Sequence, residues 1–269
     1  MTSASYSKIV STVMKHFVGG VSYFAVEMAH VCGVLHQVNL MRLVVEKYFS
    51  IRYYHKLKLD DVKSNITLYN QSDDYCFSYV NIGTNGRASD GGVYQKSNLA
   101  QALENNTLNL PDQSVIVADA AFPLKSYLMK LYRTTPTRKE KLFNYRLSRA
   151  RRIVENAFGI LVTRFRVLMN AIDMIPKKVD RITLAACALH NWLRKTSDMY
   201  ITQRCVDFED IQQGVVVPGT CRAQLRQALE GLPPTRYDNH ASRRAEAIRN
   251  TYAQLLETTE AVPWQGHMI

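Results

Sequence analysis

Apolar side chains recur with a helical period in several stretches of the chain, most clearly over residues 138–168 and 180–195. In the first stretch they return every three or four residues, at Val154, Phe158, Leu161, Phe165 and Leu168. Such spacing places them on one face of a helix. Shorter helices are predicted over residues 96–104, with Ser97 as the N-cap, and over residues 124–132.

Strand patterns dominate the first half of the chain. Residues 21–27, 47–59 and 75–83 are rich in aromatic and branched side chains and predict strands. Residues 115–118 (VIVA) are continuously apolar, which is typical of a strand buried on both faces. Strands followed by helices in this order predict an α/β domain with a mixed sheet flanked by helices.

Toward its C-terminus the sequence changes in texture. Apolar residues become few, PGT and GLPPTRYDNHAS indicate loops, and two modest helices are predicted over residues 221–230 and 243–257. We expect a short N-terminal helix over residues 1–20, the α/β domain over residues 21–195, and a loosely packed helical tail over residues 196–269.

The charge of the chain favours an acidic partner. The formal net charge is +11 and the isoelectric point is about 9.4. Residues 138–168 alone carry nine basic residues against two acidic ones, a net charge of +7. We expect nucleic acid as the partner ahead of a membrane, with a merely solvated basic surface as the alternative.

The cysteines and the N-terminal segment argue against several classes of protein. Five cysteines, widely spaced and without a C-x-x-C pair, argue against a disulfide framework and against a zinc finger. Cys187 and His190 lie close together in CALHN, and we interpret them as buried core residues rather than metal ligands. No continuous apolar segment marks a secretory signal or a membrane span, so a soluble, intracellular protein is expected.

Four acidic residues lie where a sheet edge could gather them. Glu27 ends the first predicted strand and Asp90 lies in a predicted turn. Asp119 ends the buried strand, and Glu155 lies on the long helix. Carboxylate oxygens are the ligands that Mg²⁺ prefers, and a few suffice because the ion keeps several waters. Two such ions could activate a water and stabilise the leaving oxygen in phosphodiester cleavage.

Each of these acids also has a structural interpretation. Asp119 could simply cap a turn, and the acid before the glycine pair could be an ordinary turn residue. Glu155 could pair with Arg151 or Arg152, one helical turn before it. Gly159 follows one turn later, inside a helix, where glycine costs about 1 kcal/mol relative to alanine. Its missing side chain leaves room either for a metal or phosphate, or for close helix packing.

Three blocks of the sequence carry a family resemblance: VIVADAAFPLKSYLMKLY, FNYRLSRARRIVENAFGILVTRFRVL and LHNWLR. They resemble the PIF/Harbinger transposase-derived nucleases, a branch of the D-D-E transposase superfamily with an RNase H-like fold. Between Asp119 and Glu155 lie 35 residues, a spacing characteristic of that superfamily. NIGTNGRASDGGVYQKSNL resembles the block in which the family places a further metal-associated acid, here Asp90. The resemblance is strong over residues 75–195, and AVPWQ (261–265) resembles the close of these proteins.

The N-terminal fifth of the chain departs from the family pattern. The family's first catalytic Asp belongs to a motif of the form A-[VL]-D-G-x-H-V, and the nearest match is AVEMAHV (25–31), with Glu27 in the Asp position. The resemblance therefore implies Asp119, Glu155 and Glu27 as the catalytic residues. With Asp90 they would hold Mg²⁺ or Mn²⁺.

The resemblance further implies a metal-dependent nuclease that cleaves DNA and acts in the nucleus. It also implies a separate Myb-like DNA-binding protein as partner. We expect no membrane association, and homo-oligomerisation is left open. We expect the DNA contacts on the long basic helix, at Arg149, Arg151, Arg152, Arg164 and Arg166. The alternative is a domesticated, catalytically inert transposase that binds DNA or a protein through the same basic surface.

Overall fold

The computed structural model describes part of the chain, and residues 41–269 form one compact unit. For residues 43–45, 48–52 and 63–67 the structure describes the backbone strands but not the side chains. Beyond them, the described segments are 75–77, 79–82, 90–108, 114–120, 122–133, 135–169, 172–223 and 241–269. The predicted helix over residues 1–20, the predicted strand over residues 21–27 and Glu27 lie outside the described residues.

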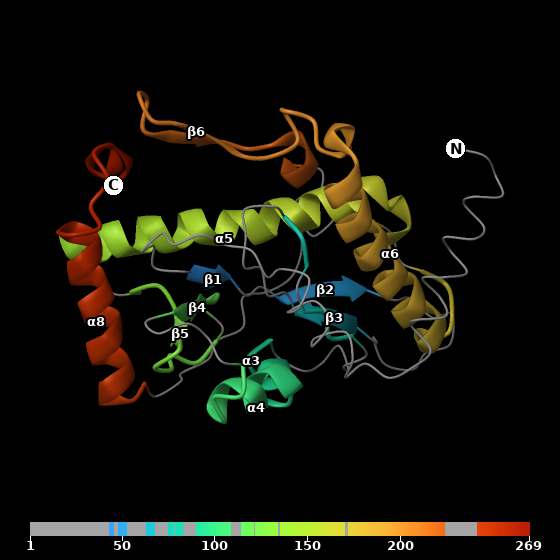
Figure 1. Ribbon diagram of the computed structural model, residues 1–269, viewed down its shortest axis with the longest axis horizontal. Coiled ribbons are helices and arrows are strands. Elements are labelled where there is room, and N and C mark those ends of the chain that lie inside the picture. The colour runs from blue at the N-terminus through green and yellow to red at the C-terminus, as the bar shows by residue number, and fades with distance from the viewer. Residues whose placement is uncertain are drawn as a thin grey trace. The chain divides into compact units, whose positions relative to one another are not determined.

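Helix α5 (Arg138–Arg164) is the long central helix of the unit (Figure 1). A capping box closes its N-terminus: the Thr137 hydroxyl accepts the backbone N–H of Glu140, and the Glu140 carboxylate accepts the backbone N–H of Thr137. The buried face of the helix is mostly apolar, which confirms the predicted long helix. A single 3-10 turn, η1 (Arg166–Leu168), follows it.

A small parallel sheet beside α5 carries the strand that precedes Asp119 (Figure 1). Strand β4 (Val115–Val117) is central, with β1 (Leu43–Val45) on one side and β5 (Leu128–Met129) on the other. All three residues of β4 are buried, which confirms a strand buried on both faces.

The helix predicted over residues 124–132 is wrong. Leu128 and Met129 form β5 and are buried beside β4. The pairing begins with the Ile116 N–H, which donates to the Tyr127 carbonyl at 2.7 Å. Leucine, methionine and lysine are good helix formers, but helix propensity is a weak preference, and the burial of a short hydrogen-bonded strand outweighs it.

A second pair of strands is antiparallel and consists of β2 (Tyr48–Arg52) and β3 (Lys63–Thr67). Strand β2 confirms the first part of the strand predicted over residues 47–59. The sequence pattern does not predict β1 or β3, because the first is very short and the second is mostly polar. The strand predicted over residues 75–83 is wrong for the described residues of that segment, which are irregular.

Side chains of helix α6 (Pro176–Thr196) hydrogen-bond the backbone of residues 75–77, which form no strand. The Asn191 amide accepts the Phe77 N–H and donates to the Phe77 carbonyl, each at 2.7 Å. Nε2 of His190 lies 2.8 Å from the carbonyl oxygen of Tyr75. These backbone groups are therefore satisfied without a neighbouring strand. Helix α6 confirms the helix predicted over residues 180–195. It begins four residues earlier, at Pro176, and proline suits the first turn of a helix.

Two short helices, α3 (Asp90–Gln95) and α4 (Asn98–Glu104), follow one another closely. Ser97 caps α4 as predicted, because its hydroxyl accepts the Ala100 N–H at 3.1 Å. Asp90 does not lie in a turn as predicted but is the first residue of α3. An acidic residue suits that position, since the first N–H groups of a helix are unpaired and its dipole is positive there.

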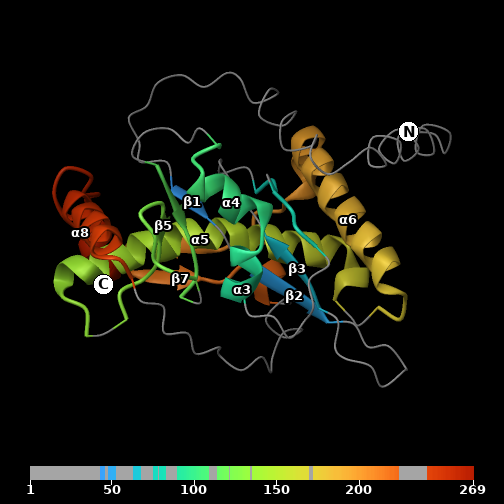
Figure 2. The same ribbon diagram turned by 90° about the horizontal axis from the view of Figure 1, so that it is seen from below.

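The C-terminal residues pack more tightly than the loosely packed tail that the sequence predicts. Helix α8 (Arg243–Glu257) confirms the second predicted tail helix, and Figure 2 shows it at one end of α5 with α6 at the other. Ala245 and Ala253 of α8 are fully buried in the same apolar core as the buried face of α5. Such small side chains let two helices approach closely, so a segment with few large apolar residues still buries one face. Of the other predicted tail helix, only residues 221–223 are described.

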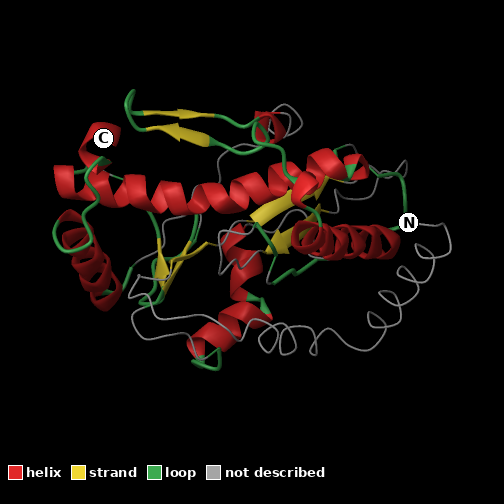
Figure 3. Ribbon diagram, turned by 45° about the horizontal axis from the view of Figure 1, so that its top comes forward, coloured by secondary structure: helices red, strands yellow, loops and turns green. Residues whose placement is uncertain are grey.

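Between α6 and α8 the chain forms a 3-10 turn, η2 (Asp198–Tyr200), and a hairpin of β6 (Phe208–Asp210) and β7 (Val215–Val217). Figure 3 shows the two hairpin strands running alongside α5. A last 3-10 turn, η3 (Gln265–Met268), lies at the C-terminus. The hairpin matters for function because it brings acidic residues toward the basic helix.

The described residues combine helices with small sheets, which confirms a mixed α and β composition. Their strands form three separate sheets rather than the single mixed sheet that the sequence predicts. The RNase H-like arrangement stays a prediction. Among the described helices, none is long and apolar enough to cross a membrane.

Candidate metal centre

Asp119 lies two residues beyond the end of β4, at the carboxyl edge of the parallel sheet. Its Oδ1 accepts the backbone N–H of Ala120, and its carbonyl accepts the N–H of Phe122 at 3.1 Å, so a tight turn follows the strand. Arg133 braces this turn by donating to the Ala120 carbonyl at 2.7 Å. The Asp119 side chain is 40% exposed, so the turn presents one carboxylate to solvent.

Glu155 reaches the same place from helix α5. Its side chain is only 12% exposed, because the adjacent Val154 and Phe158 belong to the buried face of the helix. Nη2 of Arg151 lies 3.0 Å from Oδ2 of Asp119 and 3.5 Å from Oε1 of Glu155. One guanidinium nitrogen therefore joins the two carboxylates, and the structure brings together two of the four predicted acids.

A second arginine holds the other oxygen of Glu155. Arg222 forms ion pairs with Oε2 of Glu155 and with Oδ2 of Asp207. Asp207 is 2% exposed, and its Oδ1 accepts the Gly219 N–H at 2.8 Å. We call Asp119, Glu155, Asp207, Arg151 and Arg222 the carboxylate cluster. Its three carboxylates against two guanidinium groups leave one net negative charge, which favours a cation nearby.

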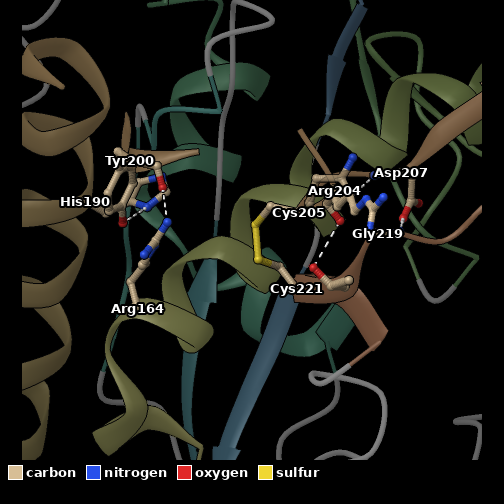
Figure 4. The surroundings of a disulfide bond; sticks show 10 residues. Arg164, His190, Tyr200, Arg204, Cys205, Asp207, Gly219 and Cys221 are labelled. Carbon is tan, nitrogen blue, oxygen red and sulfur yellow. Dashed lines mark hydrogen bonds between the residues drawn. A yellow bond between two sulfur atoms is a disulfide. The ribbon is translucent and has the colours of Figure 1, made fainter. Parts of the chain in front are cut away.

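A disulfide between Cys205 and Cys221 ties together the two segments that carry Asp207 and Arg222 (Figure 4). The Cys221 N–H also donates to the Cys205 carbonyl at 3.2 Å. The sequence argument against disulfides is therefore wrong for this pair. The two cysteines flank the β6–β7 hairpin, and the hairpin brings them side by side although their spacing in the sequence gives no sign of it.

Gly159 serves close packing rather than ligand binding. A Cβ atom there would lie 3.0 Å from the backbone N of Arg222 and from the backbone C of Cys221. The space one turn after Glu155 is thus filled by residues 220–223, which are helical. Of the two interpretations of this glycine, close helix packing is confirmed.

Arg149 and Arg152, predicted to bind DNA, pair with Glu209 of strand β6 within the protein. Nε of Arg149 lies 3.0 Å from Oε2 of Glu209, and Arg152 pairs with Oε1. The Tyr145 hydroxyl donates to the same carboxylate at 3.3 Å, and burial, with Glu209 as a further cause, raises the pKa of Tyr145. Glu209 therefore neutralises positive charge that the sequence assigns to DNA, because the hairpin lays it against α5. Arg151 is likewise in ion pairs and only 11% exposed.

Arg164 and Arg166 differ from the other three predicted DNA-binding residues. Arg164 is the last residue of α5 and Arg166 is the first residue of η1, and both are exposed. Arg164 donates to the Tyr200 carbonyl at 2.6 Å and lies 5.5 Å from the centroid of its ring. In the described part of the chain, neither arginine forms an ion pair with an acid.

Cys187 and His190 are buried core residues, as predicted. Burial raises the pKa of Cys187 to about 12, so its thiol stays protonated at neutral pH. Nδ1 of His190 lies 2.9 Å from the hydroxyl of Tyr200, and its ring stacks on Phe77 at 4.6 Å between centroids. The LHN block thus positions the segment around residues 75–77 through α6. It has no side chain in the carboxylate cluster.

The structure does not describe the side chains of the other two predicted metal ligands. Glu27 lies outside the described residues, and for Asp90 the helical backbone alone is described. Accordingly, among the residues whose side chains are described, no group of three or more His, Cys, Asp or Glu could hold a metal ion.

The strand topology adds a candidate that the sequence analysis misses. Strand β1 is parallel to β4, with Val45 opposite Val117, so both strands end at the same sheet edge. In the sequence, Glu46, which lies outside the described residues, follows Val45 directly. Ligands of α/β proteins commonly bind at the carboxyl ends of parallel strands. A short apolar run ending in an acid is the signal that could have indicated Glu46.

Comparison with known proteins places the chain in a family. The family model described as DDE superfamily endonuclease matches residues 48–191, just over half of the chain. Proteins named "Putative nuclease HARBI1" from Mus musculus, Homo sapiens and Bos taurus are 31% identical over 109 residues. The match covers 39% of this chain and 30% of each relative, so the chain spans less than a third of the relatives it matches. No solved structure matches the chain.

The matched region contains the first two blocks that carry the predicted resemblance, with the segment from Asp119 to Glu155, and the first three residues of the third block. The resemblance to Harbinger transposase-derived nucleases is thereby confirmed, and the chain belongs to the DDE superfamily endonuclease family.

Proposed function

We propose that the protein is a divalent-metal-dependent nuclease that cleaves DNA phosphodiester bonds, with an RNase H-like catalytic domain derived from a Harbinger-type transposase. One observation carries this proposal: Asp119 and Glu155, far apart in sequence, meet at a single guanidinium nitrogen. Membership of the endonuclease family supports the reaction class. Action in the nucleus and a Myb-like DNA-binding partner belong to the same proposal and rest on the family resemblance alone.

The donor set fits Mg²⁺ or Mn²⁺. Both ions take oxygen ligands, and Asp119 and Glu155 offer carboxylates that already share one cationic group. Asp90 and an acid from the N-terminal region, Glu27 or Glu46, would complete the ligands. A bound metal would supply an activated water and charge stabilisation at the leaving oxygen.

The residues of the chain itself would fix the site and the substrate. Arg222 keeps Glu155 in one orientation, because it is itself held by the buried Asp207. The turn braced by Arg133 holds Asp119 at the sheet edge. We assign phosphate contacts to Arg164 and Arg166, whose side chains are exposed.

Plasmid nicking tests the proposal directly. Purified protein should convert supercoiled plasmid to the nicked form with Mn²⁺, and EDTA should stop the reaction. Asp119→Asn and Glu155→Gln should each abolish nicking while the thermal unfolding transition remains cooperative. Arg166→Ala, which is remote from the carboxylate cluster, should nick at saturating DNA. Nicking by either carboxylate variant at the wild-type rate would remove that residue from the proposed site.

The same assay distinguishes the two candidates for the first carboxylate. If Glu27 is the ligand, Glu27→Gln removes nicking and Glu27→Asp raises the rate, because the shorter side chain matches the family's Asp. If Glu46 is the ligand, Glu46→Gln removes nicking and the Glu27 variants behave as wild type. Displacement of a reacting group by about 1 Å can cost on the order of 100-fold in rate, so the two results are well separated.

A second function is a catalytically inert protein that binds DNA or a partner. The observation in its favour is that both Asp119 and Glu155 are already ion-paired with arginines of the same chain. This function predicts salt-dependent DNA binding together with no Mn²⁺-dependent nicking at any protein concentration. Nicking that disappears in Asp119→Asn would exclude it.

A further inference from the structure

Two arginines contact Glu155, and the structure holds them very differently. Arg222 pairs with both Glu155 and Asp207. Asp207 is buried and takes a further hydrogen bond from Gly219, and the disulfide next to Arg222 fixes the backbone there. Movement of Arg222 would leave a buried carboxylate unpaired, which is strongly unfavourable.

Arg151 is held less well than Arg222, although both side chains are largely buried. Its contact with Glu155 is 3.5 Å, at the limit of a hydrogen bond, and its nearer partner Asp119 is partly exposed. Nε of Arg151 is buried without a hydrogen-bond partner among the described residues. A buried N–H donor without an acceptor is unfavourable, so this position does not satisfy the guanidinium group.

We propose that Arg151 is a built-in counter-cation, which lies between Asp119 and Glu155 in the metal-free protein and leaves when a divalent metal binds there. Arg222 stays in place and acts as the positioning residue of Glu155. This inference rests on the proposed function, because it concerns the same two carboxylates. It adds that the protein's own arginine competes with the metal.

The charges of the cluster support this exchange. Without a cation, Asp119 and Glu155 would repel each other at close range, and Arg151 removes that repulsion in the metal-free state. A divalent ion carries twice the charge of a guanidinium group and coordinates carboxylate oxygens directly. The two cations cannot both lie between the same oxygens, so metal binding must include the free energy of displacing Arg151.

Calorimetric titration of the full chain with Mn²⁺ tests the exchange without a need for activity. Arg151→Gln should bind Mn²⁺ roughly tenfold more tightly, because one unit charge is removed from within hydrogen-bonding distance of both carboxylates. Arg151→Lys, which keeps the charge, should bind within about twofold of wild type. Arg152→Gln is the matched control, since Arg152 pairs with Glu209 and contacts neither carboxylate, and its affinity should be unchanged.

Thermal unfolding gives a second measurement on the same variants. In EDTA, Arg151→Gln should unfold at a lower temperature than wild type, while saturating Mn²⁺ should raise its Tm by more than it raises that of wild type. Arg151→Met, which keeps the apolar stem, replaces the Gln variant should that one fail to fold.

The outcomes separate this inference from the proposed function. Failure of wild type and of Arg151→Gln to bind Mn²⁺ would overturn the metal centre and this inference with it. Binding by wild type together with equal or weaker binding by Arg151→Gln and Arg151→Met would overturn the competition alone. Equal tightening by Arg152→Gln would also overturn it, because the effect would then be that of net charge.

Discussion

The middle of α5 and its C-terminal end, which continues into η1, use their arginines in opposite ways. Around Glu155, the arginines of the helix face acidic residues brought by other segments: Arg151 contacts Asp119, and Arg149 and Arg152 contact Glu209. At the C-terminal end of the helix, Arg164 and Arg166 are exposed. The first region is covered by the β6–β7 hairpin and by residues 220–223, and Figure 4 shows the disulfide and Asp207 of this segment.

The difference shows that the charge of a segment and the charge available to a partner are separate quantities. The sequence gives residues 138–168 a net charge of +7. Three of those positive charges are paired within the unit, and Glu209 of the hairpin lies 57 residues beyond Arg152 in the chain. DNA binding is therefore expected at the open end of the helix, and structural stability at the covered end.

The largest effect is expected in the covered region, at Asp207. Asp207→Ala removes one partner of a buried ion pair and leaves the Gly219 N–H without its acceptor. Such changes destabilise by about 3 kcal/mol. Urea unfolding of the variant should show this loss as a lower midpoint with an unchanged slope.

Glu104→Ala is the matched control for that measurement. Glu104 pairs with Lys125 at 3.2 Å, but the side chains are 57% and 44% exposed. An exposed pair contributes about 0–1 kcal/mol, so the midpoint should hardly move. Equal losses in the two variants would mean that Asp207 is not a buried partner and that the covered region is no more closed than the surface.

A smaller effect is expected in the open region, on DNA binding. Replacement of both Arg164 and Arg166 by Ala should reduce the slope of log K against log[salt] by roughly one unit for each phosphate that the variant no longer neutralises. Arg152→Ala should leave the slope unchanged, because that arginine pairs with Glu209. Fluorescence anisotropy of a labelled duplex over a salt series measures both. A reduced slope for Arg152→Ala alone would reverse the comparison of the two regions.

The smallest effect is expected at Gly159, between the two regions. A Cβ there meets backbone atoms of residues 221 and 222, which the adjacent disulfide prevents from yielding easily. Overpacking should outweigh the better helix propensity of alanine and leave Gly159→Ala less stable by about 1 kcal/mol. At Gly266 the nearest added contact is a flexible arginine side chain at 3.8 Å, so Gly266→Ala should be neutral. A stabilised Gly159→Ala would show that the covering segment is loose.

The sequence predicts those parts of the structure whose signal is local. Helix α5 has an apolar stripe and a capping box within its own residues, and Ser97 caps α4 from the adjacent position. Strand β4 is recognisable because burial on both faces requires an unbroken apolar run. The separation of Asp119 from Glu155 likewise reflects the path from that strand to that helix, so two of the four acids are predicted to meet.

Other parts depend on interactions that no local pattern records. Strand β5 forms because β4 lies beside it, although its residues favour a helix. Residues 75–77 do not form their predicted strand because the Asn191 side chain satisfies the Phe77 backbone. Arg222 and Asp207 reach Glu155 only through the hairpin and its disulfide, so their part in the candidate site is invisible in the sequence.

A double-mutant cycle on Mn²⁺ affinity tests most directly whether Asp119 and Glu155 form one metal centre. Wild type, Asp119→Asn, Glu155→Gln and the double variant would be titrated with Mn²⁺ by calorimetry. One shared ion predicts that each single substitution weakens binding by about tenfold or more, and that the double variant is little worse than the weaker single variant. Wild-type affinity in either single variant, or losses that simply add in the double variant, would contradict a shared centre.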